Sequence, residues 1–194
     1  MLKWITSFTR QIEKQASGGG FVYNLACQYY QDIIRKEAIL ANITAQDHIL
    51  CIGGGICPFS AILFHQLTGA KVTVIDNNSA CIPEAQQVID RLKIGKDVRV
   101  FCQDGNSADL PWADYTVIHL ALQVSPLDSV LKQVTKYALP GTRLLVRRPK
   151  KQLATMYCRL VDNLLNCCPY TTHKARNIGS TLLYTKQARA GAMA

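Results

Sequence analysis

The chain has 194 residues, 48% of them apolar, which is enough for one globular domain around a single hydrophobic core. Lysines and arginines number 22 against 13 aspartates and glutamates, and the resulting formal charge of +9 favours an anionic substrate or partner. Residues 1–14 carry charges throughout, and no segment approaches the roughly 18 apolar residues of a membrane span, so we expect a cytoplasmic protein without secretion signal or transmembrane helix.

Two helices are predicted ahead of the first strand. Apolar residues recur at helical spacing in residues 1–16, and the SGGG run at 17–20 ends this helix with residues suited to a cap or a hinge. A second helix is predicted from Phe21 to Ala41. Its apolar face comprises Val22, Leu25, Ala26, Tyr29, Ile33 and Leu40. Glu37 follows Ile33 by four residues and therefore lies on this face, where a carboxylate needs an explanation.

From His48 onward the pattern changes to alternating strands and helices, which favours a parallel α/β sheet. Strands are predicted at 48–52, 71–75, 98–102, 115–120 and 142–146. Helices are predicted at 58–67, 79–93, 126–137 and 152–165. The final stretch, residues 173–186, predicts two short strands that turn around Asn177 to Gly179 and form a hairpin at the far side of the sheet.

Three consecutive glycines follow the first predicted strand directly. In HILCIGGGICPF, Gly53 and Gly55 allow the backbone to turn sharply and to approach a ligand closely. Asp76 ends the next strand in KVTVIDNN, about 20 residues later, where an acid accepts hydrogen bonds from ribose hydroxyls. This order is typical of a nucleoside-binding βαβ unit.

The details of the glycine loop narrow the choice of nucleoside. A dinucleotide site has a third glycine where this chain has Cys57, followed by Pro58, so the loop is better suited to a smaller anion such as an amino-acid carboxylate. No GxxxxGK[ST] motif is present to hold a triphosphate. The third strand ends in Gln103-Asp104-Gly105, which places another acid where an adenine or ribose would lie. A ligand with adenosine at one end and a carboxylate at the other is S-adenosylmethionine.

In these features, over roughly residues 47–186, the chain resembles the class I S-adenosylmethionine-dependent methyltransferases. The resemblance implies a Rossmann-like α/β fold, a mostly parallel seven-stranded sheet of order 3-2-1-4-5-7-6 with the last strand antiparallel. We expect residues 1–46 to form a helical lid and residues 47–190 the cofactor-binding domain. The resemblance also implies cofactor contacts: the methionine moiety to Gly53, Gly54 and Gly55, the ribose to Asp76, the adenine to Asp104, and the nucleoside's flanks to Asn77 and Gly105. One departure is Cys51, because the family usually has an acid there that binds the methionine amino group.

A second, local resemblance covers residues 21–78. The loop GGGICPFSAILFH is similar to that of nicotianamine synthases, which also carry a tyrosine and a glutamate seven residues apart, as Tyr30 and Glu37 are here. This resemblance implies transfer of the aminobutanoyl group of S-adenosylmethionine to an amine, with Glu37 as general base. The alternative is that Glu37 is structural and forms a salt bridge with Lys36, Arg91 or another surface base.

Three further features leave alternatives open. His119, at the end of the fourth strand, is predicted either to contact the substrate as a base or to be a hydrogen-bonded core residue. Tyr23, Tyr29 and Tyr30 either cover the cofactor or pack against the sheet. The basic run RRPKK, residues 147–151, either attracts an anionic substrate or is a solvated surface.

The leading prediction is therefore methyl transfer from S-adenosylmethionine to a small, anionic molecule, with Glu37, Tyr30 and His119 as catalytic candidates. Aminobutanoyl transfer and a non-catalytic cofactor-binding module are the alternatives. A nucleic-acid acceptor is less favoured, because HLALQVSP stands where nucleobase amino methyltransferases carry an acidic or asparagine-Pro-Pro motif. A homodimer is left open and no membrane partner is expected. The eight cysteines show no CxxC pair, so we expect no metal and buried reduced thiols, chiefly Cys27, Cys51, Cys81, Cys102 and Cys158.

Overall fold

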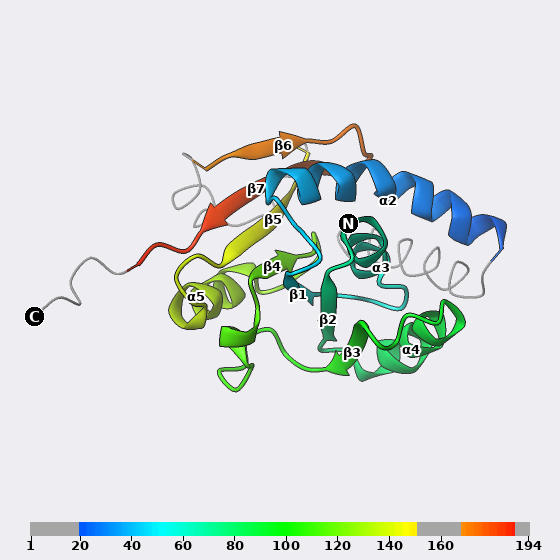
Figure 1. Ribbon diagram of the computed structural model, residues 1–194, viewed down its shortest axis with the longest axis horizontal. Coiled ribbons are helices and arrows are strands. Elements are labelled where there is room, and N and C mark those ends of the chain that lie inside the picture. Colours follow the sequence, from blue (N-terminus) through cyan, green and yellow to red (C-terminus); the bar gives the residue numbers. More distant parts are fainter. Residues whose placement is uncertain (1–19, 151–167, 189–194) are drawn as a thin grey trace, which may run out of the picture.

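A computed structural model describes residues 20–150 and 168–188 (Figure 1). They form one seven-stranded sheet of order β3-β2-β1-β4-β5-β7-β6, as predicted. The strands are β1 (His48–Ile52), β2 (Lys71–Asp76), β3 (Val98–Cys102), β4 (Val117–Leu120), β5 (Arg143–Pro149), β6 (Tyr170–Thr172) and β7 (Ile178–Thr185). Strands β1 to β5 pair in parallel, whereas β7 pairs antiparallel with both β5 and β6. The predicted helices at 1–16 and 152–165 lie outside the described residues.

The helices divide between the two faces of the sheet. On one face α2 (Phe21–Leu40), α3 (Phe59–Thr68) and α4 (Ile82–Arg91) cover a core that includes Ile34, Phe64 and Val88. On the other face α5 (Leu127–Tyr137) and the short 3-10 helix η2 (Trp112–Asp114) cover a second core. The alternation of side chains along each strand supplies both cores, since neighbouring residues point to opposite faces. The parallel strands therefore lie between two apolar layers, as the βα pattern predicts.

Most predicted elements are present, with small changes at their ends. The segment predicted as one helix at 79–93 is a 3-10 turn, η1 (Ser79–Cys81), followed by α4. Strand β5 is longer than predicted because its last residues, through Pro149, pair with β7. The hairpin prediction is correct in kind but misplaced, since β6 precedes residue 173 and β7 occupies most of the predicted segment.

Two predicted burial positions are wrong. Leu25, placed on the apolar face of α2, is 57% exposed because it lies at a cavity and not against the sheet. Tyr29, 39% exposed, lines the same cavity, which agrees with one of the two alternatives left open for it. Cys102 is exposed because it ends β3, the edge strand. Cys51 and Cys81 are buried thiols and Cys27 is partly buried, whereas Cys158 lies outside the described residues.

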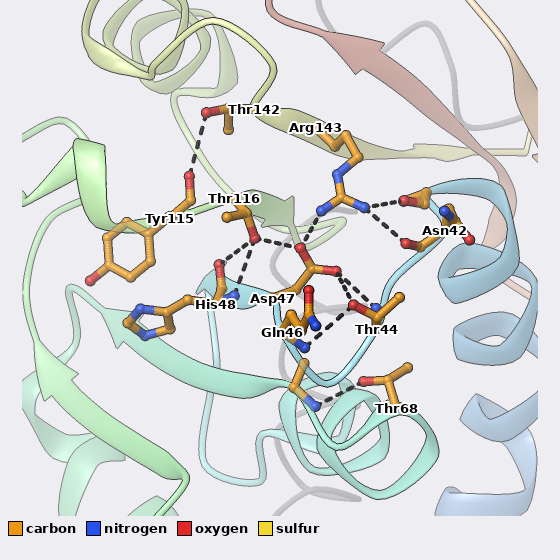
Figure 2. A network of polar contacts seen from close by, with 12 residues as sticks. Asn42, Thr44, Gln46, Asp47, His48, Thr68, Tyr115, Thr116, Thr142 and Arg143 are labelled. Carbon is orange, nitrogen blue, oxygen red and sulfur yellow. Dashed lines mark hydrogen bonds and ion pairs between the residues drawn. The ribbon is translucent and has the colours of Figure 1, made fainter.

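A polar network joins the amino ends of β1, β4 and β5 (Figure 2). Asp47 accepts hydrogen bonds from the Thr116 hydroxyl (2.7 Å) and the Thr44 N–H (2.8 Å), and it pairs with the Arg143 guanidinium. Arg143 also donates to the carbonyls of Ala41 (2.6 Å) and Asn42 (3.0 Å), just after α2. The network therefore attaches the end of α2 to the sheet at the edge opposite the carboxyl ends of the parallel strands. No helix among the described residues is long and apolar enough to cross a membrane.

Candidate functional site

A cavity of about 960 Å³ lies at the carboxyl edge of the parallel strands. This volume is at the upper end of the range for small-molecule sites, roughly 300–1,000 Å³. The structure brings to its wall every residue predicted to contact the cofactor, together with Tyr30 and His119. Those cofactor residues are Gly53, Gly54, Gly55, Asp76, Asn77, Asp104 and Gly105. Glu37 does not line the cavity, because it lies behind Arg147, which does.

The glycine loop turns as predicted, but its N–H groups are already bonded within the protein. Gly53 and Gly55 have φ of 86° and 63°, which a residue with a side chain adopts at a cost. The N–H groups of Gly53 and Gly54 donate to the Ile75 carbonyl (2.9 and 3.3 Å), and the Gly55 N–H donates to Asp76 Oδ2 (2.8 Å). The amides of Gly53, Gly54 and Gly55 are therefore occupied within the protein, so an anion at this loop would have to be held by other groups.

Two glycines are required by the strands behind them. A Cβ on Gly54 would lie 2.2 Å from Val74 Cγ1, and one on Gly105 would lie 2.7 Å from Ile52 Cγ2. Both distances are shorter than a side chain tolerates, so these residues allow the loops to pack directly on β2 and β1. The cavity lies against the sheet for that reason.

The acids at the β2 and β3 end of the cavity keep acceptor capacity. Asp76 accepts from the N–H groups of Gly55 and Asn78 (2.8 and 3.0 Å), which orients its carboxylate. Asp104 is exposed and accepts from the N–H and side-chain amide of Asn106 (2.9 and 3.2 Å) through one oxygen, Oδ1. An ionised carboxylate offers about four lone-pair positions, so both acids can still accept hydroxyl or amino hydrogens from a ligand.

At the β5 end, a fully buried ion pair joins α2 to the sheet. The Arg147 Nε and Nη2 atoms donate to the two carboxylate oxygens of Glu37, each at 2.8 Å. The Thr181 hydroxyl donates to Glu37 Oε1 (2.6 Å), and Arg147 Nη1 donates to the Ser60 hydroxyl (3.0 Å). Burial alone would raise the pKa of Glu37, but the guanidinium outweighs it and lowers that pKa well below its usual range. Glu37 is therefore an ionised partner of Arg147.

This pair differs from the salt bridges expected for Glu37. Lys36 instead pairs with Asp32 on the surface of α2 (3.0 Å), and the guanidinium of Arg91 lies over the ring of Tyr23 (5.6 Å). Arg147 is only 4% exposed, so the first residue of RRPKK is not part of a solvated basic patch. The sequence does not show which of Arg147 and Arg148 is buried. Residues 144–147 of β5 are all buried, so exposed and buried side chains do not alternate along this part of the strand.

His119 is buried next to the pair and faces the cavity wall. Its Nε2 lies 3.6 Å from Glu37 Oε2, beyond hydrogen-bond distance, and has no hydrogen-bond partner among the described residues. Burial, with a smaller contribution from the Arg147 charge, lowers the pKa of His119. Its ring is therefore neutral at pH 7. Burial also raises the pKa of the Cys51 thiol to about 12, so this residue is not an anionic substitute for the family's usual acid.

Aromatic side chains from α2 cover this end of the cavity. The ring of Tyr30 stacks on Phe59 at 5.5 Å, and Tyr29 meets Tyr30 edge-on at 5.1 Å. The Tyr29 hydroxyl accepts the backbone N–H of Arg176 (3.1 Å), which joins α2 to the turn between β6 and β7. Tyr29 and Tyr30 line the cavity, whereas Tyr23 packs on Phe59 and is not among the lining residues.

Solved structures share this architecture. A nicotianamine synthase, MtNAS, crystallised as a glutamate-to-glutamine variant with S-adenosylmethionine, matches 96% of this chain and 76% of its own, at TM-score 0.78 and 18% identity. An RNA methyltransferase from Salinibacter ruber, in complex with S-adenosyl-L-homocysteine, matches 80% of this chain and 91% of its own, at TM-score 0.61 and 15% identity. The chain has the class I methyltransferase fold. No protein-family model and no curated protein matches it.

In a class I methyltransferase fold, as in other open α/β sheets, ligands bind beyond the carboxyl ends of the parallel strands. The cavity lies there, so the fold and the predicted cofactor residues agree on its position. Sequence reasoning missed Ser60, Arg176 and Thr181, which it did not consider individually. Their importance depends on contacts between elements far apart in the chain.

Proposed function

We propose that this protein is an S-adenosylmethionine-dependent transferase, which most simply transfers a methyl group to a small anionic acceptor. The arrangement of charge in the cavity carries the proposal. Asp76 and Asp104 lie at the β2 and β3 end, and Arg147 and Arg176 lie at the β5 and β7 end. Acids suit ribose hydroxyls and an adenine amino group, and arginines suit an anionic acceptor.

The residues present fit this cofactor better than a nucleotide. The loop amides are bonded to Ile75 and Asp76, so they do not offer the row of donors that a phosphate chain needs. A cavity of about 960 Å³ has room for a nucleoside and a small acceptor together. Both solved structures described above were crystallised with S-adenosylmethionine or S-adenosyl-L-homocysteine, which supports the same choice.

Methyl transfer from a sulfonium requires little acid–base catalysis by the protein. A bond forms between the acceptor nucleophile and the methyl carbon, the carbon–sulfur bond breaks, and its electron pair passes to sulfur. Holding the nucleophile in line at about 3 Å therefore accounts for most of the rate. Where the acceptor carries a proton, His119 is the base candidate with an unpartnered nitrogen among the described residues.

Aminobutanoyl transfer is the second candidate, and one observation favours it. Helix α2, which carries Tyr30 and Glu37, contributes cavity wall, and the match to nicotianamine synthase covers 96% of the chain. The ion pair argues in the opposite direction, because Glu37 already accepts three hydrogen bonds, two from Arg147 and one from Thr181. For Glu37 to act as a base, the pair would have to open first.

The first prediction concerns cofactor binding. We expect Asp76→Ala to weaken binding of S-adenosylhomocysteine roughly 10- to 100-fold, the value of a lost charged hydrogen bond to ribose. Isothermal titration calorimetry measures this, with Asp109→Ala as control, since Asp109 is an exposed acid that does not line the cavity. Because Asp76 also bonds Gly55, thermal unfolding is recorded for each variant. Equal affinities in the wild type and Asp76→Ala would contradict the site assignment.

The by-product identifies the reaction. Methyl transfer releases S-adenosylhomocysteine, whereas aminobutanoyl transfer releases methylthioadenosine, and chromatography separates the two. Incubation with a panel of small carboxylates and amines therefore distinguishes the two candidates. Cofactor binding with neither by-product would instead support a non-catalytic binding module.

A further inference from the structure

Arg147 lines the cavity and has hydrogen-bond donors that the described residues do not use. A guanidinium has five N–H hydrogens, and the contacts to Glu37 and Ser60 use three of them. The other two, on Nη1 and Nη2, have no acceptor among the described residues. The side chain is only 3% exposed and lines the cavity, so these hydrogens are shielded from bulk water.

The guanidinium is held in one orientation. Two charged hydrogen bonds to Glu37 define its plane, the Ser60 hydroxyl takes a third N–H, and Tyr30 has its ring centroid 5.8 Å from the guanidinium carbon. Glu37 is in turn oriented by Thr181, which also contacts His173 Nε2 (2.9 Å). A buried arginine held on several sides is preorganised for a planar anion, since little side-chain freedom is left to lose on binding.

The surroundings also favour a negative ligand. Helix α3 begins at the cavity and no side chain caps its amino end, so its dipole adds positive potential there. Cys51, on the neighbouring strand, is neutral because burial raises its pKa. Among the described residues, no carboxylate other than Glu37 contacts Arg147. The glycine loop, with its three amides already bonded, does not offer an alternative anion site.

We propose that Arg147, positioned by Glu37, binds a carboxylate in the cavity, and that Glu37 serves as a positioning residue and not as the general base. This inference rests on the proposed function, because it assigns the anionic end of that same site. The carboxylate has two sources, the methionine end of S-adenosylmethionine or the acceptor. Both require the same planar, two-oxygen recognition by a guanidinium.

The affinities of two nucleosides test whether the carboxylate comes from the methionine end of S-adenosylmethionine. S-Adenosylhomocysteine and its decarboxylated analogue both keep the amine, and only the former has the carboxylate. We expect Arg147→Lys, which keeps the charge and loses the planar fork, to weaken S-adenosylhomocysteine binding about 10-fold and leave the analogue within about twofold of wild type. Arg148→Lys is the control, since Arg148 does not line the cavity. The same selective loss is expected in Glu37→Gln, where Arg147 is no longer held.

Steady-state kinetics with different acceptors test whether the carboxylate comes from the acceptor. L-Alanine, β-alanine and L-glutamate are compared as acceptors with their amides, with by-product formation as the readout. If the acceptor supplies the carboxylate, Arg147→Lys raises KM for the acids about 10-fold and leaves KM for the amides unchanged, while S-adenosylhomocysteine binds normally. Either pattern supports the proposal.

A double variant controls for misfolding caused by an unpaired buried charge. Glu37→Gln combined with Arg147→Gln removes both charges together, so neither is left buried and unpaired. Thermal unfolding checks that each variant is folded. If the folded single and double variants keep the wild-type ratio of affinities for the two nucleosides and the wild-type preference for acids over amides, the proposal is overturned. Failure of the wild type to bind either nucleoside would overturn the proposed function and this inference with it.

Discussion

At the scale of single residues, the role of a side chain in the site differs from the role that its position suggests. The resemblance to nicotianamine synthases implied that Glu37 is a general base, whereas the structure pairs it with Arg147 in β5. Gly54 looked like a cofactor residue, and it does line the cavity, but its missing side chain is required by Val74 behind it. The contacts that a residue makes within the protein thus determine which of its groups remain available to a ligand.

Gly54 supports a direct prediction. Gly54→Ala places a Cβ 2.2 Å from Cγ1 of fully buried Val74, so we expect it to lower the free energy of unfolding by about 1–3 kcal/mol through overpacking. Gly95→Ala is the control, because its added Cβ meets nothing closer than 3.7 Å. Urea unfolding measures both. The penalty should shrink when Val74→Ala is introduced with Gly54→Ala, and no interaction between the two changes would rule out the steric explanation.

At the scale of elements, β1, β4 and β5 have opposite roles at their two ends. Their carboxyl ends lead into the cavity, and their amino ends carry the network of Asp47, Thr116 and Arg143 (Figure 2). That network attaches the residues just after α2, and the Glu37–Arg147 pair attaches its last turn. Helix α2 is therefore fixed to the sheet by polar contacts at its carboxyl end, and Tyr30, nearer its amino end, lies at the cavity wall.

The network should contribute stability without contributing to binding. Asp47→Ala leaves Arg143, Thr116 and the Thr44 N–H without their shared acceptor, so we expect a loss of about 2–3 kcal/mol in unfolding free energy. The surface pair of Asp32 and Lys36 is the matched control, and Asp32→Ala should leave the free energy of unfolding close to the wild-type value, because solvent screens an exposed pair. Calorimetry should give wild-type cofactor affinity for both variants, because neither residue lines the cavity. A large loss of affinity in Asp47→Ala would contradict this separation.

At the scale of the whole molecule, burial controls how stability responds to pH. Burial lowers the pKa of three histidines, His48, His119 and His173, below the ordinary value. As pH falls through about 6.5 the unfolded chain takes up protons there and the folded chain does not until a lower pH. The unfolded state then binds more protons, so folding stability must decrease.

Acidification from pH 7.5 to 5.5 is therefore expected to lower the free energy of unfolding, with the largest contribution from His119, the most deeply buried of the three. Glu37 and Asp47 have lowered pKa values, so their contribution is present above about pH 4.3 and is lost only below it. The two effects occupy separate pH ranges. Urea unfolding at several pH values measures the slope, and His119→Gln should flatten it. Parallel profiles for wild type and His119→Gln would show that His119 does not contribute.

The sequence alone determined the fold and the position of the cavity. Parallel strands bring their carboxyl ends to one edge, so a glycine loop after one strand and acids after the next two meet there. Both signals are local: the turns need the positive φ of Gly53 and Gly55, and strand periodicity appears within a few residues.

Only the tertiary structure decided which charged side chains meet at the β5 end of the cavity. Glu37 and Arg147 are 110 residues apart, and their pairing depends on how α2 lies across β5 and on which residues of β5 face it. The bonds of the loop amides to Ile75 and Asp76 likewise depend on how the loop packs on β2. A charged side chain shows its type in the sequence, but its partner follows from three-dimensional packing, because a buried charge is stable only where an opposite charge meets it.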